Sequence, residues 1–175
     1  MATQYTSITA EQAALIRNAP LFFVATADPN LENGPDGTGA VNLSPKGGTP
    51  LHILTPNRVA YLDYPGSGNE TARHAISGGP ITIMVCSFEE GDAGIVRLYG
   101  HVRIVELDDS PLARKMLKRP AQELKKPRQV IEVNIEKTQT SCGYGVPIMA
   151  LVRERRVADR GRKYKGMIEQ IALHR

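Results

Sequence analysis

The sequence is poor in aromatic residues and in cysteine. Its 175 residues include no tryptophan, three phenylalanines, six tyrosines and two cysteines. The core must therefore be built from Val, Ile, Leu and Ala, and the low cysteine content weakly favours an intracellular compartment. We expect Cys86, in the apolar run 81–88, to be a small core residue. Cys142 lies in a glycine-rich loop and is the better candidate for a reactive thiol, although no His or Asp partner is evident.

Long hydrophobic runs and targeting signals are also missing. No apolar run approaches the length of a membrane span, and the first residues lack the basic and hydrophobic regions of a signal peptide. No spacing of Cys and His resembles a metal site, and the four histidines form no Ser/His/Asp constellation. These absences predict a cytoplasmic protein that has neither a membrane segment nor a metal centre.

Charge is distributed unevenly along the chain. Residues 1–100 contain five Lys/Arg against nine Asp/Glu, whereas residues 101–175 contain seventeen against nine. Basic clusters can mark nucleic-acid binding. Here, however, acidic residues are interspersed and aromatic interleaving is limited to Tyr164. We therefore prefer a solvated helix face or the rim of an anionic-cofactor site, and we do not expect a nucleic-acid partner.

Hydrophobic periodicity predicts a mainly β protein with peripheral helices. Hydrophobic residues make up 41% of the chain and charged residues 23%, as in ordinary globular domains. Many consecutive strands with few helices favour a closed antiparallel sheet over a βαβ repeat, within a single domain. The expected strands are 21–26, 41–44, 51–54, 59–63, 81–88, 95–106 and 129–139. One short helix is expected with Thr9 as its N-cap, and three further helices are expected at 69–77, 110–124 and 150–174.

Two donor-rich loops after neighbouring strands give the best indication of function. Ser44, Pro45, Lys46 and Gly47 form a polar stretch at the end of the strand that contains Val41 and Leu43, and residues 66–71 open a helix. A lysine ammonium can neutralise a phosphate, and the unpaired amides at a helix start can bind an anion. Together the loops favour a phosphate-bearing cofactor lying across a sheet. Taken singly, they also fit an exposed turn lysine and ordinary capping of the helix.

Two further stretches carry candidate ligand-binding side chains. Arg97 lies on a long strand, where it can contact a cofactor or pair with a carboxylate at a subunit interface. Tyr144 lies between two glycines in the loop 141–147, where its phenol can cover a planar ring. A plain turn is the alternative interpretation of this loop.

Five stretches in order resemble the FMN-binding split β-barrel proteins related to pyridoxamine 5′-phosphate oxidase. They are Val-Asn-Leu-Ser-Pro-Lys-Gly (41–47), Asn-Arg-Val-Ala-Tyr-Leu-Asp (57–63), Gly-Ser-Gly-Asn-Glu-Thr (66–71), Arg-Leu-Tyr-Gly (97–100) and Cys-Gly-Tyr-Gly-Val-Pro (142–147). Each stretch is unspecific, but the ordered set is specific. The similarity runs from about residue 22 to 105 and returns at 140–152.

The resemblance implies a Greek-key antiparallel barrel, spanning about residues 20–140 of a single 1–175 domain, with a loop and helix over 141–175. It also implies a homodimer that binds FMN in clefts between subunits. The strand 41–44 would run beside the flavin ring, the 66–71 loop would hold the phosphate, and Arg97 would reach the cofactor of the other subunit. The candidate cofactor-binding residues are Asn42, Ser44, Lys46, Ser67, Asn69, Thr71, Arg97 and Tyr144.

The sequence also departs from the pyridoxamine-phosphate oxidases themselves. Glu70 and Thr71 stand where those enzymes carry an Arg-Lys pair, and their Arg-x-His substrate signature is not evident. We therefore expect an FMN-dependent oxidoreductase with an unassigned small-molecule substrate, and not vitamin B6 oxidation. The alternatives are a deazaflavin-dependent reductase and a non-enzymatic flavin-binding protein. No side chain is assigned as a catalytic acid or base, because the flavin itself would carry the redox step.

Overall fold

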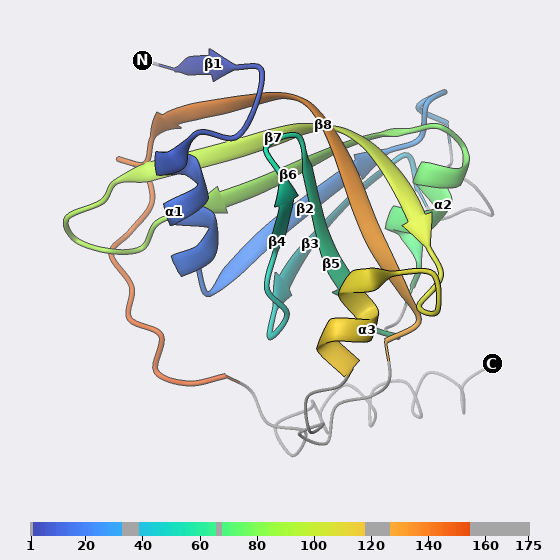
Figure 1. Ribbon diagram of the computed structural model, residues 1–175. Helices are drawn as coiled ribbons and strands as arrows, with labels where there is room; N and C mark the ends of the chain where they lie inside the picture. Colours follow the sequence, from blue (N-terminus) through green and yellow to red (C-terminus); the bar gives the residue numbers. More distant parts are fainter. Residues whose placement is uncertain (1, 33–38, 66–67, 118–126, 155–175) are drawn as a thin grey trace, which may run out of the picture.

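A single curved antiparallel sheet dominates the molecule (Figure 1). The computed structural model describes residues 2–32, 39–65, 68–117 and 127–154. The strands follow the order β3-β2-β6-β7-β8-β5-β4, and β1 pairs with β8 outside this path. Their bounds are β1 Thr3–Tyr5, β2 Leu21–Ala27, β3 Val41–Gly47, β4 His52–Thr55, β5 Arg58–Asp63, β6 Pro80–Cys86, β7 Gly94–Val105 and β8 Gln129–Cys142.

Alternating burial along the strands explains why the sheet curls around a core. In β2 every second residue is buried, and these side chains meet the buried faces of β5, β6, β7 and β8 in the main core. Phe22 and Tyr61 pack edge-to-face there, with ring centroids 5.2 Å apart. A smaller cluster covers the opposite face of β5 and β8, where α3 packs; it comprises Ala60, Leu62, Val105, Leu112, Ala113 and Val130.

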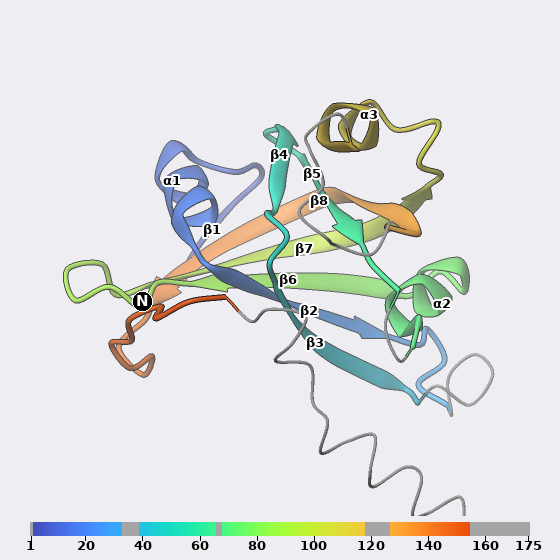
Figure 2. The same ribbon diagram turned by 90° about the horizontal axis from the view of Figure 1, so that it is seen from below.

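The three described helices lie at the periphery, with α1 and α2 at opposite ends of the sheet (Figures 1 and 2). Helix α1 (Ala10–Asn18) begins with a capping box in which the Thr9 side chain accepts from the Gln12 backbone and the Gln12 side chain accepts from the Thr9 backbone. Helix α3 (Pro111–Leu117) begins after Ser110, whose Oγ accepts from the Ala113 backbone. Helix α2 is Glu70–Ile76.

Strand β3 is longer than the sequence predicted, which corrects the expected position of Lys46. The strand runs to Gly47, so Ser44, Pro45 and Lys46 lie within it and not in a loop beyond it. The reason is pairing: β2 matches β3 residue for residue from Ala27↔Val41 to Leu21↔Gly47. An edge strand tolerates Pro45 because one of its sides has no neighbour.

Other boundaries also differ from expectation. Strand β1 was not predicted. Strand β8 continues to Cys142 because the whole of β7 pairs with it, from Val105↔Val130 to Gly94↔Cys142. The expected helix 150–174 is wrong at its start, since residues 150–154 are not helical. The remainder of that helix and residues 118–124 of the expected third helix lie outside the described residues.

The two edge strands of the sheet, β3 and β4, are not joined by a ladder in the described chain. The sheet nevertheless curls far enough for β3 to approach β5, because Lys46 of β3 forms an ion pair with Asp63 of β5. The mainly β class, with an antiparallel split barrel and peripheral helices, is thereby confirmed.

Candidate functional site

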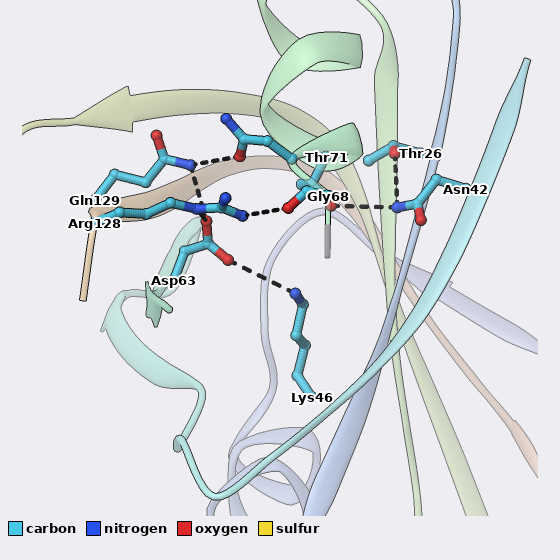
Figure 3. A network of polar contacts seen from close by, with 9 residues as sticks. Thr26, Asn42, Lys46, Asp63, Gly68, Thr71, Arg128 and Gln129 are labelled. Atoms are coloured by element: carbon cyan, nitrogen blue, oxygen red, sulfur yellow. Dashed lines mark hydrogen bonds and ion pairs between the residues drawn. The ribbon is translucent and has the colours of Figure 1, made fainter. Parts of the chain in front are cut away.

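The carboxylate of Asp63 organises a cluster of polar side chains at the opening between β3 and β5 (Figure 3). Asp63 ends β5 and is only 5% exposed. Its Oδ1 lies 3.7 Å from the Nζ of Lys46. Its Oδ2 accepts from Arg128 Nε at 2.6 Å and from Gln129 Nε2 at 2.9 Å. One nearly buried carboxylate thus holds two cations and an amide in fixed positions.

The same side chains reach the segment that leads into α2. Arg128 donates through its second terminal nitrogen to the Gly68 carbonyl at 3.0 Å, and Gln129 donates to Asn69 Oδ1 at 3.1 Å. Asn69 is the N-cap of α2 by position, yet it makes no side-chain capping bond. Its amide oxygen is committed to Gln129 instead. The two polar stretches expected to converge therefore do converge, around Asp63.

Lys46 lies against an aromatic ring as well as a carboxylate. Its Nζ is 5.8 Å from the centroid of Tyr61, and its side chain is 24% exposed. The Tyr61 hydroxyl is buried without a hydrogen-bond partner in the described structure. Burial and the charge of Asp63 raise its pKa far above the usual value of 10.0, although Thr71 and Arg128 lower it somewhat. Tyr61 therefore remains a protonated hydroxyl.

Asn42 and Thr71 join the cluster from the opposite side. The amide nitrogen of Asn42 lies 3.3 Å from the hydroxyl of Thr71 and 3.3 Å from that of Thr26 (Figure 3). Because side chains alternate along a strand, Asn42, Ser44 and Lys46 share the half-buried face of β3. The structure thus brings together four predicted residues, Asn42, Lys46, Asn69 and Thr71, and Ser44 lies on the same face of β3. Ser67 lies outside the described residues.

Arg97 lies on the other face of the sheet. Directly paired residues point to the same side of an antiparallel sheet. Lys46 pairs with the buried Phe22, and its side chain therefore faces the core. Arg97 instead belongs to the row of directly paired residues Pro45, Phe23, Met84, Arg97 and Gln139, which faces outward. Within one chain, the sheet itself separates Arg97 from Lys46.

The loop 141–147 stays with Arg97 and away from the Asp63 cluster. Arg97 donates to Ser141 Oγ at 2.9 Å, and Gly143 donates its backbone N–H to the Ala93 carbonyl. Tyr144 is 92% exposed and covers no ring or cavity of its own chain among the described residues. Neither Arg97 nor Tyr144 therefore takes part in the site that one chain forms by itself.

Three residues of the cluster were missed by the sequence interpretation: Asp63, Arg128 and Gln129. Asp63 was placed correctly at the end of a strand but was not assigned a role. The available signal was an acid closing an otherwise apolar strand. Its partners lie 65 and 66 positions away along the chain, and they become neighbours only because β5 pairs with β8, with Asp63 opposite Gln129.

A cavity of about 260 Å³ lies elsewhere, beside the C-terminal end of α1. Its lining includes Ile16, Ala19, Leu21, Phe22 and Leu51 and contains none of the polar residues of the Asp63 cluster.

No helix among the described residues is long and apolar enough to cross a membrane. The described parts of the chain also contain no group of three or more metal-ligating side chains. The cytoplasmic location stays a prediction.

The curled antiparallel sheet, with a polar cluster at its opening, defines a split β-barrel protein. A family model described as pyridoxamine 5′-phosphate oxidase matches residues 8–142. The chain belongs to the pyridoxamine 5′-phosphate oxidase family, as its sequence motifs indicated.

Known proteins similar to this chain include one curated relative and several solved structures. The chain is 37% identical over 134 residues to the pyridoxamine 5′-phosphate oxidase family protein ustO of Aspergillus flavus, covering 75% of this chain but 51% of ustO. It thus spans about half the length of that relative.

Two solved structures show the likeness in fold. HupZ from Group A Streptococcus has a TM-score of 0.55 and 21% identity, with 75% of this chain and 91% of that chain covered. An FMN-binding protein from Syntrophomonas wolfei has a TM-score of 0.50 and 16% identity, with 85% and 86% covered. At such identities the likeness concerns the fold alone.

Proposed function

We propose that this chain binds FMN and acts as a flavin-dependent oxidoreductase on a small molecule. The observation that carries the proposal is the convergence of Lys46, Arg128 and the segment 68–71 around Asp63. Family membership and the FMN-binding protein of similar fold support the choice of cofactor. The phosphate would be held by Lys46, Asn69 and Thr71, with Arg128 beside them.

The donors present fit a phosphate monoester. Lys46 has three N–H donors and Arg128 has five, and Asp63 occupies only part of this set. The hydroxyl of Tyr61, which is buried without a hydrogen-bond partner in the described structure, lies close to Thr71 and supplies another donor. A buried hydroxyl that lacks a partner costs free energy until an acceptor reaches it. An oxygen-rich anion is such an acceptor.

Asp63 and Glu70 limit the positive charge at this place. Asp63 offsets one of the two cations, and the carboxylate of Glu70 folds back over the Cα of Gly68. The site thus relies on directed hydrogen bonds more than on excess charge. This arrangement differs from the Arg-Lys pair of the pyridoxamine-phosphate oxidases. Vitamin B6 phosphates are therefore not the proposed substrates, and the substrate stays unassigned.

A bound flavin would supply the redox chemistry, accepting and returning a hydride or single electrons. The chain would contribute binding and orientation. Asn42, Ser44 and Lys46 lie along one face of β3, so that strand would run along the cofactor while Lys46 fixes its phosphate end. None of these side chains is assigned a proton-transfer step.

We further propose that the active unit is a homodimer with the flavin at the subunit interface. Val41 and Leu43 of β3 are 67% and 68% exposed on the outer face, beside the row that contains Arg97. An apolar strand face of this kind favours burial against another surface. A second copy would cover it, and Arg97 would then approach the cofactor held by the partner and favour negative charge on its reduced ring. Tyr144 would cover that ring.

The first test is the visible absorbance spectrum of the purified protein, with mass spectrometry of any released ligand.

The second test compares Lys46→Ala with the unchanged protein in titrations with FMN and riboflavin. Loss of a charge-assisted hydrogen bond should weaken FMN binding by about tenfold or more, because such bonds contribute about 1.5–3 kcal/mol. Riboflavin lacks the phosphate and should be affected much less.

Lys115→Ala provides the matched control, since Lys115 is an exposed lysine on α3. It should bind both flavins as the unchanged protein does. Equal losses for FMN and riboflavin in Lys46→Ala would remove Lys46 from the phosphate site. Absence of binding of either flavin by the unchanged protein would contradict the proposed function as a whole.

A further inference from the structure

A chain of hydrogen bonds leads into the phosphate site from the inner side of the sheet. It starts at the carbonyl of Gly39, which lies 2.8 Å from Nε2 of His74 on α2. The other ring nitrogen, Nδ1, lies 3.0 Å from the hydroxyl of Thr26 on β2. Thr26 in turn contacts the amide nitrogen of Asn42, which also contacts Thr71. His74 is 0% exposed and Thr26 is 3% exposed, so water does not compete for these bonds.

The donor and the acceptor of every hydrogen bond in this series follow from its first group, the carbonyl of Gly39. A backbone carbonyl can only accept, so Nε2 of His74 carries the hydrogen. In a neutral imidazole the other nitrogen then accepts, and the hydroxyl hydrogen of Thr26 points to Nδ1. The Thr26 oxygen is left as an acceptor, and it must therefore face the N–H of the Asn42 amide. The acceptor role of the Thr26 oxygen thus fixes the orientation of the Asn42 amide.

The fixed amide determines what the site presents to a ligand. Both N–H groups of Asn42 are used, one toward Thr26 and one toward Thr71. Its carbonyl oxygen turns away from both hydroxyls (Figure 3) and accepts no hydrogen bond from the described residues. Thr71 accepts from Asn42, so its own hydrogen is not used between these two residues and is available to a further acceptor.

We propose that His74 and Thr26 are positioning residues that set Thr71 as a hydrogen-bond donor and the Asn42 carbonyl as an acceptor. The inference rests on the proposed function and deepens it. An ionised phosphate has only acceptors to offer, and a polyol hydroxyl beside it can donate. A donor at Thr71 next to an acceptor at Asn42 matches that order in a polyol phosphate. The series of hydrogen bonds from His74 through Thr26 to Asn42 would thus make the site prefer FMN over riboflavin without adding a charge.

The decisive variants change the hydroxyl of Thr26 and leave its shape. In Thr26→Val the Asn42 amide loses the acceptor of one of its N–H groups, and the amide can rotate by half a turn. Its oxygen would then accept the hydrogen of Thr71, which would no longer be available to the phosphate. We expect the dissociation constant for FMN to rise about tenfold, as for the loss of one bond to a charged group, while that for riboflavin changes less than about twofold. Thr26→Ser keeps the hydroxyl and should restore the preference for FMN.

Equal losses for the two flavins in Thr26→Val, or the same result for Val and Ser, would show a merely structural role and overturn the inference. A protein that binds FMN normally but fails these comparisons would leave the proposed function standing. Failure of the unchanged protein to bind either flavin would overturn both.

A second measurement does not depend on any variant folding. Nitrogen-15 spectra of the imidazole groups in the unchanged protein should show His74 with hydrogen on Nε2 and none on Nδ1. The opposite tautomer would reverse the chain of bonds and overturn the inference directly.

Discussion

The hydroxyl of Tyr61 is the group at which binding and stability oppose each other. It is buried beside Lys46 and lacks a hydrogen-bond partner in the described structure. Such a group destabilises the folded state, because in the unfolded chain it would bond to water. A hydroxyl retained at this cost is explained if a ligand accepts its hydrogen.

Replacing Tyr61 by Phe tests that explanation. In the absence of ligand, the free energy of unfolding should stay level or rise by about 1 kcal/mol, since an unsatisfied group is removed while the ring remains. Binding of FMN should nevertheless weaken. Urea denaturation and flavin titration measure the two effects. Tyr5→Phe, at an exposed position on β1 away from the cluster, should change neither the free energy of unfolding nor the affinity for FMN. Weaker stability with unchanged FMN affinity in Tyr61→Phe would contradict the assignment.

The raised pKa of Tyr61 also has a consequence for stability at high pH. Above the ordinary pKa of 10.0, the unfolded chain releases this proton while the folded chain retains it. Proton release then favours unfolding, so this contribution to the free energy of unfolding falls as the pH rises above 10.0. The pH dependence of stability between about pH 9 and pH 11 should therefore be steeper in the unchanged protein than in Tyr61→Phe. Equal slopes would mean that the hydroxyl ionises freely in the fold.

At the residue scale, the sequence singled out the members of the Asp63 cluster that lie in local motifs. Lys46, Asn69 and Thr71 were found because each stands in a stretch with a recognisable pattern of donors. Asp63 and Arg128 were not, because their roles arise from the pairing of β5 with β8. A carboxylate at the centre of two cations cannot be inferred from either stretch alone.

At the scale of elements, local signals predicted the starts of the strands well and the ends of β3 and β8 poorly. The capping box at Thr9 needs only four consecutive residues, and it was confirmed. Strand β3 contains a proline and a glycine that indicate a turn, but seven pairings with β2 keep it extended. Pairing between distant segments overrides local preference, and it is this extension that places Lys46 on the same face as Asn42.

Helix α2 holds its position by a close backbone approach at Gly79. A Cβ at Gly79 would lie 2.0 Å from the Ala27 carbonyl oxygen of β2 and 2.9 Å from that of His74. Backbone atoms cannot yield as a flexible side chain can. Gly79→Ala should therefore push α2 away from β2 and lower the free energy of unfolding by about 2–3 kcal/mol.

The displacement should also weaken FMN binding, because α2 carries Thr71 and His74. Gly91→Ala is the matched control, since a Cβ at Gly91 meets nothing within 4 Å. Chemical denaturation and flavin titration of the two variants provide the comparison. Similar stabilities for both would show that α2 adjusts freely.

At the scale of the whole molecule, the sheet has two faces with different chemistry. Lys46 and Asn42 face inward with the core, while Arg97 faces outward beside the exposed Val41 and Leu43. The alternation of side chains was readable from the sequence, but the assignment of Lys46 and Arg97 to opposite faces required the register across four strands. If both residues serve one flavin, they must come from different copies of the chain, and a two-fold axis then gives two identical sites.

Mixed dimers distinguish this arrangement from a site within one chain. Lys46→Ala and Arg97→Ala should each lose flavin affinity as homodimers. When the two variant chains are combined in one dimer, one of its two sites joins an intact Lys46 to an intact Arg97, and the other site contains both changes. The mixed dimer should therefore bind one flavin with the affinity of the unchanged protein, measured by absorbance after separation through two different affinity tags.

The reciprocal mixture pairs the unchanged chain with a chain that carries both substitutions. If each site uses Lys46 from one copy and Arg97 from the other, every site in this dimer contains one defect, and none binds normally. If each site lies within one chain, the outcomes exchange: the reciprocal mixture retains one normal site and the first mixture retains none. Because both mixtures contain the same residues in the same numbers, any difference between them reports only which chain contributes Arg97.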